Sequence, residues 1–382
     1  MEPLLPADPT LRAVVLATDV ISILVAWFLI RRAKTAGRMI DASLAGPAFA
    51  GIVGIVSAIA VGLGSFAFLR VVEHAIFLVG VPASLISLVY AWRRRYWVVV
   101  SIAAVSGPLL TFVFVWSHYV EPHDLEVTVH EVVTDRLPAG SDGVRVVVLA
   151  DLQTDDFGDY EQSVFDRIAE LEPDLLLLPG DFIQVSGQPF FREHAKFLAA
   201  LRNLPRPPMG ILAVEGDVDP MRWRYREPSA FFDDGAGPIA RLLDDEFLPF
   251  ESPNVLVLGL KQRSSRQPLK QEWIDRIRDF DGLVLIMGHA PDYAIPTIRG
   301  ETDLDAILIA GHTHGGQVVI PGFGPPITLS AVPREVAGGG LHQFGEALVS
   351  VSRGVGLERG YAPRLRLFCR PELVVFDFKP KG

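Results

Sequence analysis

Aspartate and histidine side chains recur where short apolar segments end in the second half of the chain. In chain order they are Asp151, Asp181, Asp217, His289, His312 and His314. Several follow a glycine, as in Gly180-Asp181 and Gly288-His289, which lets the backbone turn sharply and leaves room for an ion. Carboxylate and imidazole ligands together suit Mn, Fe, Zn or Co better than a dedicated calcium site. The pattern therefore predicts a metal site.

Each fragment of this series is weak evidence when taken alone. A glycine-aspartate pair after a strand is usually a turn, and a single histidine there is more often structural. His312 and His314 alternate around Thr313, so both can face one site in an extended segment. It is the ordered series of such fragments that favours one shared site.

The elements that must position these side chains have the pattern of an α/β domain. Apolar, β-branched runs predict strands at 144–150, 174–178, 210–214, 254–258, 283–287, 306–309, 346–351 and 373–378. Intervening segments predict helices at 160–171, 191–201, 268–278 and 292–298. Continuous apolar strands that alternate with helices indicate covered sheets. Ligands bind at the carboxyl ends of such strands, which is where the Asp and His residues lie.

The first third of the chain is almost entirely apolar. Spans at 13–30, 42–69, 75–92 and 96–116 each reach the roughly 18–20 residues that cross a bilayer. A cleaved signal peptide is the alternative for the first span, but the residues that precede this span lack the basic region of such a peptide. The second span carries small residues four apart, which allow close helix packing: Gly46, Ala50, Gly54, Ala58 and Gly62. We therefore expect a four-helix transmembrane region at 1–120, a linker with a leading strand at 121–142, and the α/β domain at 143–382.

Basic residues predict the orientation of the spans. They concentrate after the first and third spans, at Arg31, Arg32, Lys34, Arg38, Arg93, Arg94 and Arg95. Positive loops stay in the cytoplasm. Four crossings then place both the N-terminus and the α/β domain outside, in a multi-pass protein of the cell membrane. Asp19, Glu73 and His74 lie in or near spans, and with no partner evident we favour a helix-packing role over a functional one.

Composition excludes some classes of function. The 45 acidic residues outnumber 35 basic ones, which gives a net charge of −10. Such a chain lacks the basic surface that nucleic acid needs as a main partner. The single cysteine, Cys369, excludes an internal disulfide and does not fix the compartment.

The ordered series resembles the calcineurin-like metallophosphoesterase family, whose motifs run Asp-x-His, Gly-Asp, Gly-Asn-His-Asp/Glu, Gly-His and Gly-His-x-His. The resemblance extends from about residue 143 to the C-terminus and is most specific at 311–317, Gly-His-Thr-His-Gly-Gly-Gln. Segments 352–356 and 366–373 are similar to the closing strands of the family's bacterial, membrane-anchored branch. This resemblance implies a four-layer α/β/β/α sandwich with a two-metal site.

The resemblance also implies roles for individual residues. Asp151 and His314 would bind the first metal, and Asp181 would bridge both. His289, His312 and Asp217 would bind the second. Asp181, Asp217 and His289 would be the catalytic residues, and Arg353 is a candidate contact for the substrate phosphate.

Three positions depart from the family pattern. Gln153 replaces the histidine of the first motif, and its carbonyl oxygen is a candidate ligand. Asp217 replaces an asparagine, and Val218 replaces the histidine that would stabilise the transition state or protonate the leaving group. The first two changes favour oxygen donors, so we expect two divalent ions, Mn first, with Mg, Fe or Zn as alternatives.

These features predict a metal-dependent phosphoester hydrolase in which two ions activate water for direct attack on phosphorus. Without an acid at Val218, the leaving group should be stable as an anion, which favours phosphodiesters or pyrophosphates. A membrane anchor raises the effective concentration of lipid-linked phosphates, so these are the expected substrates. Two alternatives stay open: a metal-binding pseudoenzyme or membrane scaffold, and a transporter or sensor that works through its first 120 residues. Oligomeric state is not predicted.

Overall fold

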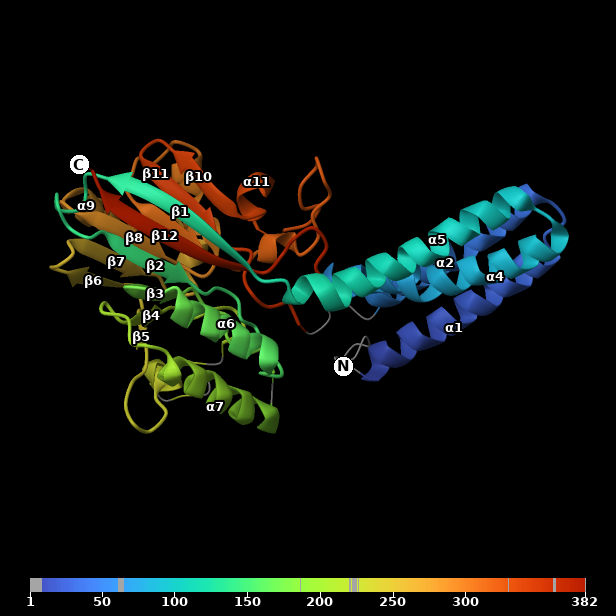
Figure 1. Ribbon diagram of the computed structural model, residues 1–382, viewed down its shortest axis with the longest axis horizontal. Coiled ribbons are helices and arrows are strands. Elements are labelled where there is room, and N and C mark those ends of the chain that lie inside the picture. The colour runs from blue at the N-terminus through green and yellow to red at the C-terminus, as the bar shows by residue number, and fades with distance from the viewer. Residues whose placement is uncertain are drawn as a thin grey trace. The chain divides into compact units, whose positions relative to one another are not determined.

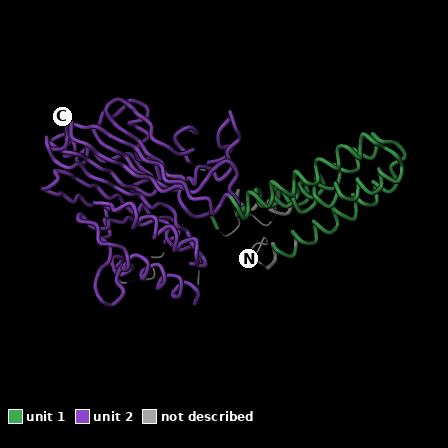
Figure 2. Tube along the Cα trace, in the orientation of Figure 1, with its two compact units in different colours: residues 1–120, 358–364 green, residues 121–357, 365–382 purple. Residues whose placement is uncertain are grey.

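The computed structural model of the chain describes residues 9–60, 65–185, 187–219, 221, 225, 227–328, 330–359 and 362–381. The chain divides into two compact units (Figure 2). A helical unit comprises residues 1–120 and 358–364, and an α/β unit comprises residues 121–357 and 365–382. The predicted linker at 121–142 is thus part of the α/β unit.

The helical unit is built from long apolar helices. These are α1 (Pro9–Arg32), α2 (Ala36–Ala60), α3 (Ser65–His74), α4 (Gly80–Arg94) and α5 (Trp97–Val115), with π-helical segments η1 (Ala75–Val79) and η2 (Trp116–Val120). Among the described residues, three stretches are long and apolar enough to cross a membrane: Ala36–Val56, Phe68–Arg94 and Trp97–His123. The α1 helix is not one of them, so the count of four spans stays a prediction.

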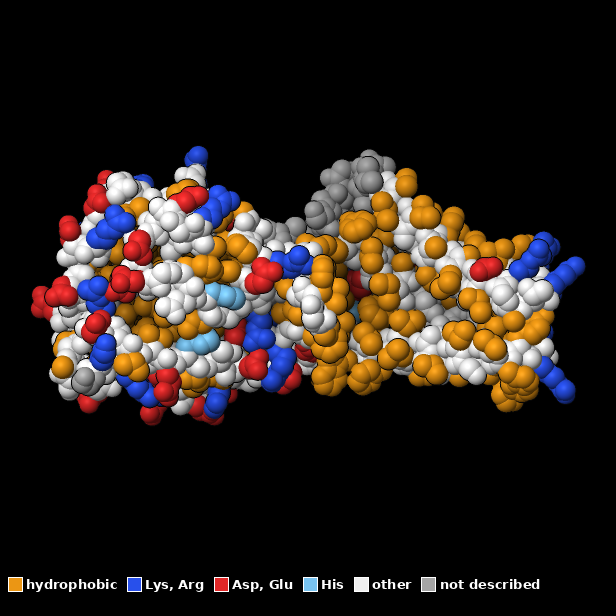
Figure 3. Space-filling view, turned by 90° about the horizontal axis from the view of Figure 1, so that it is seen from above, with side chains coloured by type: hydrophobic (Ala, Val, Ile, Leu, Met, Phe, Trp, Pro, Cys, Tyr) orange, Lys and Arg blue, Asp and Glu red, His pale blue; other side chains and the backbone are white. Residues whose placement is uncertain are grey.

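Small residues bring these helices into close contact. A Cβ atom at Gly46 would lie 2.7 Å from the Cβ of Ala26 on α1, and one at Gly54 would lie 1.9 Å from a methyl carbon of Val71 on α3. Gly62, which belongs to the same predicted stripe, lies outside the described residues. The outward surface of the unit is apolar (Figure 3), with side chains such as Val105 and Phe112 more than half exposed. Close packing inside and apolar side chains outside suit a bilayer.

The two basic loops lie together at one end of the helical unit. The Arg94 guanidinium donates to the backbone carbonyls of Arg31, at 2.5 Å, and Ala33. The Tyr96 hydroxyl donates to the carbonyl of Lys34 at 2.8 Å. The loops that follow the first and third predicted spans therefore share one end, as the orientation argument requires.

The described part of the α/β unit contains two six-stranded mixed sheets (Figure 1). The first runs in the order β1 (Glu126–Thr134), β12 (Glu372–Pro380), β2 (Val144–Val148), β3 (Leu175–Leu178), β4 (Ile211–Ala213) and β5 (Arg241–Leu242). The second runs β10 (Gly340–Phe344), β11 (Ala347–Val351), β9 (Ile307–Ala310), β8 (Leu283–Met287), β7 (Val255–Gly259) and β6 (Glu246–Phe250). Strands β2, β3 and β4 are mutually parallel, as are β7, β8 and β9.

Side-chain alternation along the strands places the cores in three layers. Val146 and Val148 of β2 join strands of both sheets in a central core, whereas Val147 packs with helices α6 (Asp159–Glu170) and α7 (Gln188–Asn203). A third core lies between the second sheet and helices α9 (Gln271–Arg278), α10 (Ile295–Ile298) and α11 (Arg334–Ala337). Helices thus cover the outer faces of two stacked sheets, which is the predicted layered α/β arrangement.

The predicted elements match the observed ones closely, with small differences at their ends. The helix predicted at 292–298 is a short 3₁₀ turn, η6 (Pro291–Ala294), followed by the single turn α10. Strands β5, β6 and β10 were not predicted. They are the outermost strands of their sheets or lie next to a hairpin partner, and their partly exposed side chains lack a continuous apolar run.

Candidate metal centre

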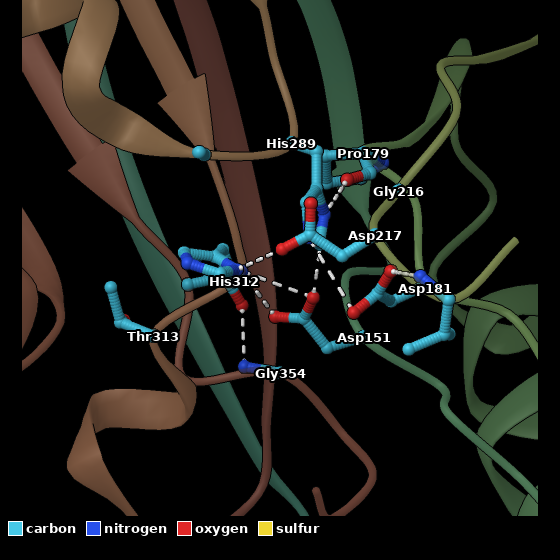
Figure 4. A network of polar contacts seen from close by, with 12 residues as sticks. Asp151, Pro179, Asp181, Gly216, Asp217, His289, His312, Thr313 and Gly354 are labelled. Carbon is cyan, nitrogen blue, oxygen red and sulfur yellow. Dashed lines mark hydrogen bonds and ion pairs between the residues drawn. The ribbon is translucent and has the colours of Figure 1, made fainter. Parts of the chain in front are cut away.

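The two sheets bring five of the predicted ligands to one place (Figure 4). Asp151, Asp181 and Asp217 follow the parallel strands β2, β3 and β4 of the first sheet, within four residues of each strand end. His289 and His312 follow β8 and β9 of the second sheet in the same way. The carboxyl ends of parallel strands lie at the same edge of a sheet, so stacking the two sheets makes one cluster of the five side chains.

The cluster contains two groups of ligands. Asp151, Asp181 and His289 offer atoms within 4.8 Å of one another, and so do Asp217, His289 and His312. His289 belongs to both groups. The sequence resemblance had placed Asp181 as the residue shared by two ions, and that assignment stays a prediction. The donor atoms are oxygens and imidazole nitrogens, a set suited to divalent transition metals.

His289 is oriented as a metal ligand would be. Its Nδ1 lies 2.9 Å from the carbonyl of Pro179, to which only an N–H can donate. The Nε2 atom then carries the lone pair in the neutral ring. That atom is buried without a hydrogen-bond partner and lies 3.4 Å from an Asp181 oxygen and 3.7 Å from an Asp217 oxygen. A cation between these groups would satisfy all of them, so the residues present fit a metal.

Glycines allow the backbone to pack directly against the ligand carboxylates. A Cβ atom at Gly216 would lie 2.2 Å from Oδ1 of Asp181, and one at Gly354 would lie 2.7 Å from the Cβ of Asp151. Only a residue without a side chain fits at either position.

Backbone amides hold the carboxylates in place. The N–H of His312 donates to both oxygens of Asp151, at 3.1 and 2.9 Å, and the N–H of Val218 donates to Oδ1 of Asp181 at 2.9 Å. Asp219, which sequence reasoning did not single out, accepts from the backbone amides of Asp181, Phe182 and Gly216 at 2.8–2.9 Å. It thereby ties the loop after β4 to the loop after β3.

The electrostatics of the cluster favour positive charge. Burial raises the pKa of Asp151 to about 7, and burial with the neighbouring Asp181 raises that of Asp219 to about 7. Burial alone would lower the pKa of His289, but the surrounding carboxylates raise it to about 10. Burial opposes ionisation of Asp217 as well, yet the neighbouring imidazoles of His289 and His312, with nitrogens 3.7 and 3.1 Å from its Oδ2, hold its pKa far below the usual range. The site therefore stabilises a cation wherever one enters.

Two further predicted ligands lie in the same loops. Gln153 is fully buried, and its backbone N–H donates to the carbonyl of Asp181 at 2.8 Å. His314 is buried and begins the short turn η7 (His314–Gly316). Its ring is outside both ligand groups found among the described residues. Coordination by Gln153 and His314 stays a prediction.

Arg353 makes contacts within the fold. Its Nη2 lies 2.6 Å from a Glu126 oxygen and 2.9 Å from a Glu372 oxygen, and its side chain is 20% exposed. These ion pairs join the loop after β11 to strands β1 and β12. The predicted contact with a substrate phosphate stays a prediction, and the geometry favours a structural role.

Sequence reasoning missed two side chains next to Asp217. Gln262 Nε2 donates to Oδ1 of Asp217 at 2.6 Å, and Arg266 Nη2 donates to Oδ2. Both lie in the segment that follows β7, so they too come from the carboxyl end of a strand. The available signal was the run of polar and basic residues directly after the predicted strand 254–258.

Comparisons with known proteins agree with this geometry. The family model for calcineurin-like phosphoesterases matches residues 144–316, which include the five converging ligands. A metallophosphoesterase of Bacillus subtilis, YkuE, is 29% identical over 273 residues, which cover 69% of this chain and 89% of that protein.

Two other relatives have more specific names. The phosphodiesterase YaeI of Escherichia coli is 40% identical over 94 residues, which cover 24% of this chain and 31% of that protein. The UDP-2,3-diacylglucosamine pyrophosphatase LpxG of Chlamydia muridarum is 24% identical over 326 residues, which cover 72% of this chain and 94% of that protein.

Proposed function

This chain carries a phosphoester hydrolase domain of the calcineurin-like family, and from that premise we propose that it is a two-metal phosphodiesterase or pyrophosphatase acting on a lipid-linked phosphate. The observation that carries the catalytic part is the pair of ligand groups that share His289. We further propose that Asp151, Gln153, Asp181, Asp217, His289, His312 and His314 hold the ions, and that Asp181, Asp217 and His289 are catalytic.

The chain's own residues explain how such a site would work. Two bound divalent ions supply Lewis-acid activation of water and offset charge on the phosphoryl oxygens. The amide of Val218 donates to the carboxylate of Asp181, and the backbone amide of Asp181 donates to Asp219. These contacts fix Asp181 in the position where it faces His289. The Val218 side chain holds no proton to give, so the leaving group should depart as a stable anion. Phosphodiesters and pyrophosphates meet that requirement better than alkyl monoesters.

Hydrolysis of bis-p-nitrophenyl phosphate by the purified full-length chain tests the catalytic proposal. Turnover should require Mn²⁺, and Asp181→Ala should abolish it. Asp279→Asn is the matched control, because that carboxylate is exposed at the end of α9 and should leave the rate unchanged. Absence of turnover with any divalent ion would favour the pseudoenzyme alternative instead.

We propose manganese as the resident metal, with Mg, Fe or Zn as the alternatives. The oxygen-rich donor set, with Asp217 in place of an asparagine, supports a hard ion. Metal analysis of protein purified without added metal decides this point. Tightly held zinc alone would overturn the proposal of manganese.

The lipid-linked substrate rests on two observations. The helical unit contains three stretches suited to a membrane, which would hold the enzyme near bilayer lipids at high effective concentration. One relative is named for a pyrophosphatase of an acylated sugar nucleotide. From this relative we apply only the substrate class to the chain, a diester or pyrophosphate attached to a lipid. We do not apply its particular substrate, because the basic loops favour an extracytoplasmic position for the α/β unit.

The substrate class is tested with the full chain reconstituted into vesicles. Polyprenyl or diacylglyceryl pyrophosphates and phosphodiesters should be cleaved with a higher kcat/KM than their water-soluble head-group analogues. Equal kcat/KM for both sets would remove the argument from the membrane and leave only the phosphoester hydrolase.

A further inference from the structure

Residues 260–266, which follow β7, form a platform beside the metal ligands. Ser265 is fully buried, donates to the carbonyl of Gln262 at 2.7 Å and accepts from the amide of Ala290, next to His289, at 3.2 Å. On the other side, Asp245 accepts from Ser264 and from the amide of Lys261, both at 2.9 Å. The turn η5 (Ser264–Arg266) is thus fixed from two directions.

This platform presents Gln262 and Arg266 to the second ligand group. Gln262 binds one oxygen of Asp217, and Nη2 of Arg266 binds the other. The same Nη2 lies 3.3 Å from Nε2 of His312. A guanidinium therefore lies against two of the three residues in that group.

Solvent exposure of the side chain distinguishes Arg266 from the buried metal ligand His289. Its side chain is 38% exposed, whereas that of His289 is completely buried. Within the described part of the chain, the guanidinium makes its contacts through Nη2, which leaves Nε and Nη1 for a ligand from solvent. A guanidinium binds two phosphate oxygens in one plane, so its chemistry suits an incoming phosphoester.

We propose that Arg266 contacts the substrate phosphate and stabilises the departing oxygen, the role that Val218 cannot perform. This inference rests on the proposed function, because it names the residue that assists leaving-group departure at that same site. Arg266 is always charged, so it contributes electrostatic stabilisation and not a proton. The oxygen of the attacking water forms a bond to phosphorus and its proton passes to solvent. The bond between phosphorus and the leaving oxygen breaks, and that oxygen leaves with the electron pair next to the guanidinium.

A purely structural role for Arg266 predicts a different result. Asp217 brings a negative charge to a position where the family has an asparagine, and Arg266 offsets that charge. If this were its only role, Asp217→Asn would make Arg266 dispensable. The double variant R266A/D217N would then be as active as D217N alone.

The kinetic test uses the full chain with Mn²⁺ and a series of aryl phosphodiesters whose leaving phenols differ in pKa. For Arg266→Ala we expect a loss in kcat/KM of roughly 10²-fold, as for removal of one oxyanion-stabilising donor. The loss should grow as the leaving phenol becomes more basic, and R266A should cause the same loss when D217N alone is the reference. A uniform loss across the series, or equal activity of R266A/D217N and D217N, would overturn the proposal.

Binding of inorganic phosphate separates this inference from the proposed function. In the presence of Mn²⁺, Arg266→Ala should weaken phosphate binding at least tenfold, measured by calorimetry, while the Kd for Mn²⁺ stays within about threefold of the parent value. Arg263→Ala, an exposed arginine three positions earlier, is the matched control and should change neither constant. Unchanged phosphate affinity would overturn the inference even if the enzyme is active. Weakened affinity would support it even if no tested diester is hydrolysed.

Discussion

The side chains at the metal centre stand on backbone conformations that non-glycine residues rarely adopt. Asp151, Asp181 and His312 have φ values of 50°, 58° and 72°, and Gln153 and His314 have 43° and 49°. Such left-handed conformations each cost about 1–3 kcal/mol and persist where surrounding contacts impose them. Their concentration in five predicted ligands indicates that the loops are shaped for the site, and it supports Gln153 and His314 as members of it.

Replacing Gly216 with alanine should weaken metal binding and leave the protein folded. A Cβ atom there would lie 2.2 Å from Oδ1 of Asp181, so the carboxylate must move. We expect Gly216→Ala to lower the rate of Mn²⁺-dependent hydrolysis roughly 10²-fold, as displacement of a catalytic group by about 1 Å does. Calorimetric titration with Mn²⁺ should show weaker binding.

Gly158→Ala is the control for this substitution, because its nearest neighbour would be 3.9 Å away and its φ is ordinary for any residue. Circular dichroism should show both variants folded. Parental Mn²⁺ affinity in Gly216→Ala would contradict the close approach between this backbone and Asp181.

At the scale of elements, Glu372 joins strands that are far apart in the sequence. Its carboxylate accepts from Thr128 of β1 at 2.6 Å and from the guanidinium and amide of Arg353 at 2.9 and 3.1 Å. Burial of this side chain opposes its ionisation, but the contacts with Arg353 outweigh burial and lower its pKa below 4.5. The ionised form is therefore the one that stabilises the fold.

This lowered pKa predicts how Glu372→Gln changes stability with pH. A carboxylate whose folded pKa is depressed contributes stability above its unfolded pKa, near 4.5, and loses it as pH falls through the folded value. At pH 7 the variant leaves Arg353 with one carboxylate fewer, which should lower the free energy of unfolding by about 3 kcal/mol. The difference between parent and variant should shrink steadily below pH 4.5.

Urea unfolding of parent and Glu372→Gln in parallel measures that difference directly. Asp151 and Asp219 titrate near neutral pH in both proteins, so their contributions cancel in the comparison. A difference that does not change with pH would mean that the ion pair with Arg353 is not the source of the stability.

Elements and ligands were predictable from the sequence to different degrees. Strands β3, β8 and β9 are continuous apolar runs, β2 is interrupted only by Arg145, and Gly, Asp or His residues follow each of them, so periodicity and motif pointed to the same places. The partition of ligands into groups that share His289 was not predictable, because it depends on how two sheets stack. Arg266 and Gln262 were missed for a related reason: their loop contacts Asp217 only through tertiary packing.

At the scale of the whole molecule, the helical unit buries ionisable side chains for which the sequence showed no partners. Asp19 lies 2.9 Å from His74, and Glu73 lies 3.2 Å from Arg70 and 2.7 Å from His118. All five are less than a tenth exposed. The pairs join α1 to α3 and α3 to η2, so charged residues inside this apolar bundle link its helices, which agrees with the predicted packing role.

Removing one partner of the buried pair should weaken the helical unit. Arg70→Met leaves Glu73 paired with His118 alone in an apolar interior, which should cost about 3–5 kcal/mol. The double variant R70M/E73Q removes both charges and should recover part of this loss. Unfolding of the full chain in mixed detergent micelles, followed by helical circular dichroism, measures both effects. Arg93→Met, at an exposed basic position, is the control. Equal stability of R70M and parent would refute the coupling.

Whether α1 crosses decides which side of the membrane the N-terminus faces, because the basic loop before α5 places the α/β unit outside in either case. Three stretches meet the criterion for a span, and an odd number of crossings puts the two chain ends on opposite sides. With α1 as a fourth span, the ends lie on one side, and the basic loops around Arg31 and Arg94 lie on the other. Those loops are hydrogen-bonded to each other at one end of the unit, as both arrangements require.

Reporter fusions at each end of the full chain decide between these arrangements. We expect a C-terminal and an N-terminal alkaline phosphatase fusion both to be active, because that enzyme folds outside the cytoplasm, and fluorescent-protein fusions at both ends to be dark. Replacing Arg93, Arg94 and Arg95 with Gln should weaken this bias, since cytoplasmic basic residues fix orientation. An inactive N-terminal fusion with an active C-terminal one would mean three crossings, with the α/β unit still outside. An inactive C-terminal fusion would instead put the metal centre on the cytoplasmic side, and intermediates exposed on that face would replace extracytoplasmic ones as the substrates to test.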